Sequence, residues 1–274
     1  MKRSLLLLSF LTIAVSVFSQ HQLVKLWETD TTLKTPESVL YDEVNKVLYV
    51  ANIDGEPWGR DGKGSIGKVG LDGKIIATDW VTGFNCAKGM GLHNDLLYVA
   101  DLSCVKVVDI KKGAIVDSIR FENAQALNDL TVDKDGIVYV TDSRAKKLYR
   151  VENKKPVLLL DSLKGPNGVL KNKDGLFLLD AGAMYKVNDD RSLTKMAEGM
   201  EGGTDGVENI SGSDYIVSCW AGTIYYVAQD GTKQLLLDTR AEKKNTADIG
   251  INPKSKIIYV PTFFKNSVVA YEVK

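Results

Sequence analysis

Six polar residues with cation-binding and proton-transferring side chains recur along the chain at intervals of roughly 40 residues. Each stands ten to twelve positions before the central residue of an apolar segment, and they are Glu37, Lys88, Asn128, Asn167, Asp205 and Asp248. Carboxylates and carboxamides offer oxygen ligands, which hard cations such as calcium prefer, whereas zinc prefers His or Cys. If the fold gathers these residues, the sequence predicts a site for one divalent cation, with calcium the best match.

The elements that must position these residues form a repeated strand pattern. Six apolar segments align on Tyr49, Tyr98, Tyr139, Phe177, Ile216 and Tyr259, and a period near 40 residues is the length of one four-stranded propeller blade. Asp-Gly pairs separate many of these segments, and we expect them to form primed hairpin turns. The sequence therefore predicts an all-β, six-bladed β-propeller. First strands line the central channel of a propeller, so their starts converge at one end of it.

The ring of blades must be closed, because an open sheet edge invites aggregation. The segment Gln22–Glu28 is apolar and alternating, and Val268–Val273 ends the last repeat. We predict that the N-terminal strand completes the sixth blade beside the C-terminal strands. No linker divides the chain, so residues 20–274 are expected to form a single propeller domain.

The first 19 residues have the pattern of a signal peptide. Lys2-Arg3 precede an apolar stretch from Leu5 to Phe18, and Ser19 ends a small-residue site with cleavage before Gln20. The stretch is too short to cross a bilayer comfortably, so no membrane span is expected. The mature protein is predicted to be exported, either periplasmic or extracellular.

Composition and cysteine usage narrow the functional classes. The chain has 35 basic and 35 acidic side chains, so no net positive field favours a nucleic-acid partner. We expect a monomer that binds a small molecule. The three cysteines are neither a disulfide framework nor a metal motif. Cys86 and Cys104 either form a pair or remain free thiols.

The sequences around four of the six polar residues resemble motifs of a known family. They are Thr35-Pro36-Glu37-Ser38, Asn128-Asp129, Gly165-Pro166-Asn167-Gly168 and Thr204-Asp205-Gly206. These motifs are similar to those of the senescence-marker-protein/gluconolactonase/luciferin-regenerating-enzyme family of six-bladed propellers. The resemblance implies that Glu37, Asn128, Asn167 and Asp205 surround one central divalent cation. Ser38 stands where the family often has Gly, and Ala126 where gluconolactonases commonly have a sugar-holding Arg.

The same resemblance implies a metal-dependent hydrolase of small lactones, esters or phosphoesters. Asp205 would be the nucleophile or general base, and Lys88 would stabilise an oxyanion or form an ion pair with Asp248. Because Ala126 replaces the sugar-holding Arg, a generic lactone, ester or phosphoester is favoured over a sugar lactone.

Further residues are expected around the mouth of the pocket. Second strands run back towards the end of the channel where the six polar residues gather, so Asp142 and Trp220 would lie at the rim of the pocket. Asp142 is equally compatible with a turn after a strand. The irregular segment Asp54–Gly67 carries Trp58 and is long enough to cover a site. Together with Asp248, these residues are the predicted substrate pocket.

Two other interpretations remain open. Polar residues in a wet propeller channel can simply face water. A propeller can also keep the ion as a structural plug and bind a ligand or protein without catalysis, because fold does not settle function. A Ser-His-Asp hydrolase is excluded, because neither His21 nor His93 has a suitable context and no Gly-x-Ser-x-Gly motif occurs.

Overall fold

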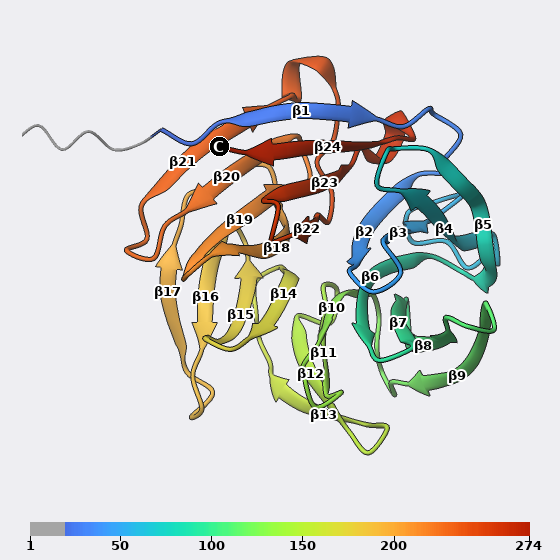
Figure 1. Ribbon diagram of the computed structural model, residues 1–274. Helices are drawn as coiled ribbons and strands as arrows, with labels where there is room; N and C mark the ends of the chain where they lie inside the picture. Colours follow the sequence, from blue (N-terminus) through green and yellow to red (C-terminus); the bar gives the residue numbers. More distant parts are fainter. Residues whose placement is uncertain (1–19) are drawn as a thin grey trace, which may run out of the picture.

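The computed structural model describes residues 20–274, and within this range the chain forms six four-stranded antiparallel sheets (Figure 1). The predicted all-β, six-bladed propeller is confirmed. The predicted signal peptide, residues 1–19, lies outside the described residues. Among the described residues, no helix is long and apolar enough to cross a membrane.

Each blade is built from consecutive strands, except the last, which recruits the N-terminal strand. The first two blades contain β2 (Pro36–Asp42), β3 (Val47–Asn52), β4 (Gly64–Gly70), β5 (Ile75–Phe84), β6 (Ala87–His93), β7 (Leu96–Asp101), β8 (Cys104–Asp109) and β9 (Ala114–Arg120). The third and fourth contain β10 (Leu127–Val132), β11 (Val138–Asp142), β12 (Lys147–Glu152), β13 (Lys155–Leu160), β14 (Pro166–Asn172), β15 (Gly175–Asp180), β16 (Ala183–Val187) and β17 (Leu193–Ala197). The last two contain β18 (Thr204–Ser211), β19 (Asp214–Cys219), β20 (Thr223–Val227), β21 (Lys233–Asp238), β22 (Gly250–Asn252), β23 (Ile257–Pro261), β24 (Val268–Val273) and β1 (Leu23–Glu28).

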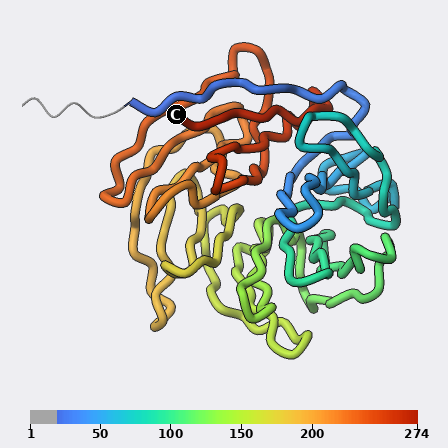
Figure 2. Tube along the Cα trace, in the orientation of Figure 1, coloured from blue at the N-terminus to red at the C-terminus, as the bar shows by residue number. Residues whose placement is uncertain are grey.

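The first strands of the six blades surround a common centre, where each contacts the first strand of the next blade (Figures 1 and 2). Apolar side chains fill the space between neighbouring blades. Tyr49 and Phe84 of the first blade, for example, pack with Leu97 and Val99 of the second, and all four are fully buried. The alternating strand pattern thus buries one layer of side chains between each pair of blades and holds the central strands in a ring.

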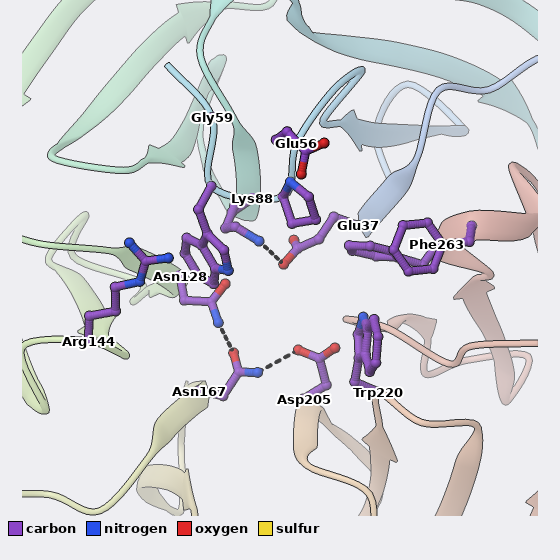
Figure 3. A pocket seen from close by; sticks show the side chains of 13 residues that line it. Glu37, Glu56, Gly59, Lys88, Asn128, Arg144, Asn167, Asp205, Trp220 and Phe263 are labelled. Carbon is purple, nitrogen blue, oxygen red and sulfur yellow. Dashed lines mark hydrogen bonds and ion pairs between the residues drawn. The ribbon is translucent and has the colours of Figure 1, made fainter. Parts of the chain in front are cut away.

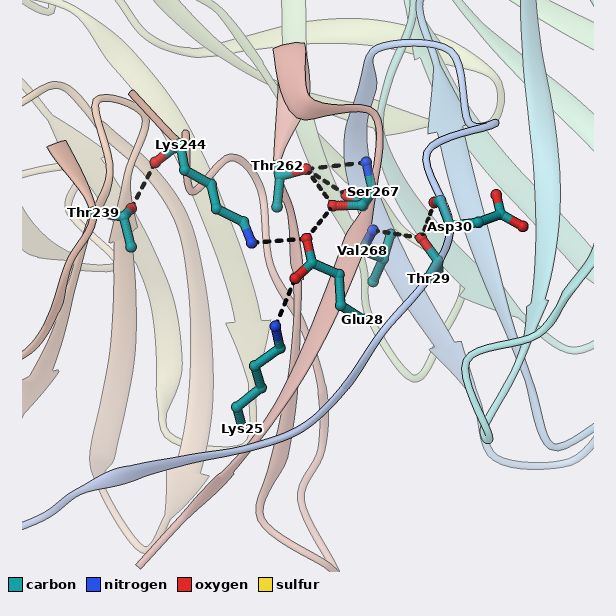
Figure 4. Close-up of polar contacts among 9 residues, drawn as sticks. All are labelled: Lys25, Glu28, Thr29, Asp30, Thr239, Lys244, Thr262, Ser267 and Val268. Carbon is teal, nitrogen blue, oxygen red and sulfur yellow. Dashed lines mark hydrogen bonds and ion pairs between the residues drawn. The ribbon is translucent and has the colours of Figure 1, made fainter. Parts of the chain in front are cut away.

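Strand β1 closes the ring as predicted, pairing with β24 from Leu23 opposite Val273 to Glu28 opposite Val269. At the end of β1, the Glu28 carboxylate lies 2.7 Å from both Lys25 Nζ and Lys244 Nζ and accepts a hydrogen bond from Ser267 Oγ (Figure 4). Partial burial acts to raise the pKa of Glu28, but the hydrogen bonds from Lys244, Lys25 and Ser267 outweigh it and lower the pKa to about 2. The closing strand is therefore held by a charged contact as well as by sheet hydrogen bonds.

The Asp-Gly pairs lie in hairpin turns, but the expected primed geometry is wrong. Gly136 has φ 80°, whereas Asp135 is not in the left-handed region. Gly136 N donates to Asp133 O at 3.0 Å, and Asp133 N donates to Ile137 O at 2.9 Å. This is a longer loop in which only the glycine needs the left-handed conformation, because its lack of a Cβ removes the steric cost.

Two glycines allow the central strands to approach one another closely. A Cβ on Gly168 would lie 2.3 Å from Asp205 O, and one on Gly206 would lie 2.5 Å from Ile249 N. Each glycine directly follows one of the six polar residues, so a side chain there would push neighbouring first strands apart. Ser38 occupies the equivalent position in the first blade, where its Oγ donates to Asp248 Oδ2 at 2.6 Å and ties β2 to the sixth blade.

The described structure contains no disulfide, and Cys86, Cys104 and Cys219 are free thiols. Cys86 Sγ donates to Pro57 O at 2.8 Å, while Cys104 Sγ donates to Asp101 O at 3.5 Å. Of the two possibilities left open by the sequence, the structure has the unpaired one.

Candidate functional site

The six polar residues predicted to converge at the end of the channel are called the ring residues below. Five of them line one pocket there. The cavity is about 640 Å³ and is lined by Glu37, Glu56, Pro57, Trp58, Gly59, Lys88, Asn128, Arg144, Asn167, Asp205, Trp220, Phe263 and Phe264. Figure 3 shows the ring side chains converging from different blades. The repeat thus brings together residues that are up to 168 positions apart (Glu37 to Asp205).

Three of these residues form a continuous chain of hydrogen bonds. Asn128 Nδ2 donates to Asn167 Oδ1, and Asn167 Nδ2 donates to Asp205 Oδ1, both at 2.7 Å (Figure 3). Asn128 Nδ2 also donates to Ser143 Oγ at 3.1 Å. The chain orders side chains from three consecutive blades around one point.

Lys88 is paired with Glu37, so the predicted ion pair with Asp248 is wrong. Lys88 Nζ lies 2.9 Å from Glu37 Oε1, and only 3% and 5% of the two side chains are exposed. Burial alone would lower the pKa of Lys88, but the charge and hydrogen bond of Glu37 outweigh it and raise that pKa. The Lys88 ammonium is therefore a fixed positive charge on one side of the ring.

The oxygen atoms of the ring residues that remain available suit a hard cation as ligands. Glu37 Oε2 is buried and has no hydrogen-bond partner among the described residues. Burial, followed by the charges of Glu37 and Asp248, raises the pKa of Asp205 well above its usual value, so negative charge here is incompletely balanced. No group of three or more His, Cys, Asp or Glu side chains in residues 20–274 could hold an ion. An ion would therefore depend on the amide oxygens of Asn128 and Asn167 as well as on Glu37 and Asp205, an all-oxygen set that fits calcium.

Asp248 does not line the pocket, because the sixth repeat is out of register by one residue. Glu37 stands three positions before Leu40, which pairs with the aligned Tyr49, and the same offset holds for Lys88, Asn128, Asn167 and Asp205. In the sixth blade Tyr259 pairs with Gly250, so the sixth ring position is Ala247. Asp248 belongs to the next layer of the channel, since a shift of one residue reverses the direction of a strand side chain.

Asp142 does not line the pocket either. Its carboxylate accepts hydrogen bonds from the backbone N–H groups of Gln125, Ala126 and Ala145, at 2.7–3.0 Å. Asp101 and Asp180 make the same kind of contact with the segments that precede Lys88 and Asn167. These aspartates hold the entry to each first strand and so position the ring residues, which is the turn role that the sequence left open.

Trp58 and Trp220 both line the pocket. Trp58 lies on the loop between β3 and β4, whose backbone is tied to the second blade by the Cys86–Pro57 hydrogen bond. The Lys88 ammonium lies 4.1 Å from the centre of the Trp58 ring, a favourable cation–π contact. The loop therefore packs against Lys88, one of the ring residues, and forms one wall of the pocket.

Three lining residues were missed by the sequence reasoning. Phe263 and Phe264 follow β23 on the short 3-10 helix η2 (Phe263–Lys265), and Arg144 follows β11. The signal for them was available, because Trp220 was placed at the rim on the ground that second strands end there. Arg144, Phe263 and Phe264 occupy the corresponding places after the second strands of the third and sixth blades.

Comparisons with solved structures identify the fold. A gluconolactonase from Xanthomonas campestris superposes with a TM-score of 0.72 at 14% identity, over 89% of this chain and 88% of that one. A streptogramin B lyase gives 0.67 at 11% identity, over 93% and 97%. The fold is that of these six-bladed propellers. A virginiamycin B lyase from Staphylococcus aureus gives 0.64 at 13% identity, over 92% and 99%. Neither a protein-family model nor a curated protein sequence matches the chain.

Proposed function

We propose that this protein is a metal-dependent hydrolase of small lactones, esters or phosphoesters, acting at the channel-end pocket. The observation that carries the proposal is the buried, unpartnered Glu37 Oε2 beside a hydrogen-bonded series of Asn128, Asn167 and Asp205. The shared fold of a gluconolactonase supports it, although that likeness concerns the fold alone.

Glu37, Asn128, Asn167 and Asp205 would hold one divalent cation, with calcium the preferred ion for an all-oxygen set. When bound, the cation supplies Lewis-acid polarisation of a carbonyl or phosphoryl oxygen. Lys88 fixes the orientation of the Glu37 carboxylate, because Lys88 Nζ lies 2.9 Å from Glu37 Oε1 and both side chains are buried. Lys88 is therefore better placed to position Glu37 than to act on substrate.

Asp205 is the residue best placed for proton transfer. Its Oδ1 accepts the Asn167 hydrogen bond, while Oδ2 has no protein partner among the described residues. As general base, Oδ2 takes a proton from water while the water oxygen bonds to the acyl carbon or phosphorus. The bond to the leaving oxygen breaks, and the proton passes from Asp205 to that oxygen.

The competing proposal is a non-catalytic ligand- or protein-binding propeller with a structural cation. The Glu37–Lys88 pair favours it, because the ammonium already balances one of the two ring carboxylates. Turnover separates the two proposals, since metal binding is common to both.

The test measures hydrolysis of an aryl ester, a lactone and a phosphotriester with added calcium and after chelation. The hydrolase proposal predicts calcium-dependent turnover that is lost in Asp205→Asn. Glu56→Gln is the matched control, because Glu56 lines the pocket mouth but is exposed and lies outside the ring. Bound calcium without turnover of any class would favour the binding proposal.

A further inference from the structure

Arg144 presents a free cation to the pocket. It is exposed, lines the cavity, and has no carboxylate within ion-pair distance among the described residues. Its guanidinium carbon lies 5.1 Å from the centre of the Trp58 ring, so the aromatic face supports the side chain on one side. A planar guanidinium with unused donors is suited to bind a carboxylate through two hydrogen bonds.

The position of Arg144 is set by a tightly bonded turn. Ser143 N donates to Ala126 O at 3.0 Å, and Ser143 Oγ donates to Pro166 O at 2.6 Å. On the other side, Ala145 N donates to the buried Asp142 carboxylate at 2.8 Å. The residues flanking Arg144 are therefore fixed, and its guanidinium is held beside the Trp58 ring at the pocket wall.

An aromatic wall lies on the opposite side of the pocket from Arg144 (Figure 3). The ring of Trp220 lies 5.5 Å from that of Phe263 and 6.0 Å from that of Phe264, both edge to face. Trp220 and Phe264 are 39% and 58% exposed, although large aromatic side chains are usually buried. Phe263 has φ 50°, a strained conformation for a bulky residue that is typical of functional sites.

We propose that the pocket selects substrates that carry both a carboxylate and an aromatic or similarly flat apolar group. Arg144 binds the carboxylate, and Trp220, Phe263 and Phe264 pack against the apolar group. The reactive ester or lactone then lies between them, over Asp205. A polyhydroxylated sugar lactone would leave its hydroxyl groups against an apolar wall without hydrogen-bond partners. The identity of the reactive bond rests on the proposed function, whereas the binding preference does not.

The test uses probes that cannot be hydrolysed at an ester, so it does not depend on turnover. The dissociation constants of 3-phenylpropionate and its neutral amide, 3-phenylpropionamide, are measured by calorimetry on the full mature protein with calcium present. We expect the carboxylate to bind about tenfold more tightly than the amide, the usual effect of one charge-assisted contact. In Arg144→Gln this preference should disappear, while in Arg144→Lys part of it should remain.

Lys146→Gln is the matched control, because Lys146 is an exposed cation near Arg144 that does not line the pocket. It should keep the tenfold preference, which shows that net charge alone is not responsible. Equal binding of the two probes, no binding of either, or a preference that persists in Arg144→Gln would each overturn the proposal. If the preference is present but no ester, lactone or phosphotriester turns over, the proposed function fails while this inference stands.

Discussion

Removal of the Lys88 ammonium tests whether the ring is built around a buried charge. Lys88→Met leaves the Glu37 carboxylate buried without its partner at 2.9 Å. Breaking a buried ion pair from one side costs about 3–5 kcal/mol, and the lost cation–π contact with Trp58 adds about 1 kcal/mol. In a domain of this size each kcal/mol lowers Tm by about 2–4 °C, so the variant should melt roughly 8–24 °C below wild type in chelator.

Calcium should then restore much of this loss. A cation bound by Glu37 and Asp205 compensates the charge that Lys88 no longer balances, and it binds only the folded protein. The rise in Tm on adding calcium should therefore be larger in Lys88→Met than in wild type. Differential scanning calorimetry with chelator and with millimolar calcium measures both quantities.

Two controls make the result interpretable. Lys111→Met removes a lysine whose ion pair with Asp95 is largely exposed, so it should cost no more than about 1 kcal/mol. Glu37→Gln combined with Lys88→Met should cost less than the sum of the single changes, because no buried charge is left unpaired. A Tm of Lys88→Met within about 2 °C of wild type in chelator would refute a desolvated pair.

Three further predictions concern stability and reactivity. Glu28→Gln should lower the free energy of unfolding by about 1–2 kcal/mol near neutral pH after solvent screening. Because the pKa of Glu28 in the folded protein is lowered to about 2, this loss should persist above pH 4.5 and fade as the pH drops towards 2. Thermal melting at several pH values measures it. Burial raises the pKa of Cys86 to about 12, so alkylation followed by mass spectrometry should label it in the unfolded but not the native protein; rapid native labelling at pH 8 would contradict its burial. Asp142→Asn should lower stability by about 1–3 kcal/mol, because one of its oxygens no longer accepts backbone hydrogen bonds; unchanged melting would reject its positioning role.

The sequence was sufficient to predict the blades, because each buries the same alternating face against its neighbour. The closing pair of β1 with β24 matches the structure closely. Turn geometry was less predictable, since an Asp-Gly pair suits several hairpin loops. The irregular segment expected at Asp54–Gly67 is shorter than expected, because its last residues from Gly64 join β4.

In the first five blades a polar residue stands three positions before the first-strand residue that pairs with the aligned one, and the spacing of ten to twelve positions from the aligned residue was enough to find it. In the sixth blade nine positions separate Gly250 from its partner Tyr259, so the equivalent position is Ala247, twelve before Tyr259, whereas Asp248 is eleven before it. Spacing therefore indicated Asp248, whereas pairing assigns Ala247. Arg144, Phe263 and Phe264 occupy the positions after second strands that located Trp220, so the repeat could have indicated them, but the direction of a side chain in a turn does not follow from strand periodicity.

Calorimetric titration of the chelator-treated protein with calcium tests the central claim most directly. We expect one binding site whose affinity for calcium falls by about tenfold or more in Glu37→Gln, because one of two ligand charges is removed, while Glu56→Gln binds as wild type does. No binding in wild type, or equal affinity in wild type and Glu37→Gln, would contradict a cation site formed by these residues.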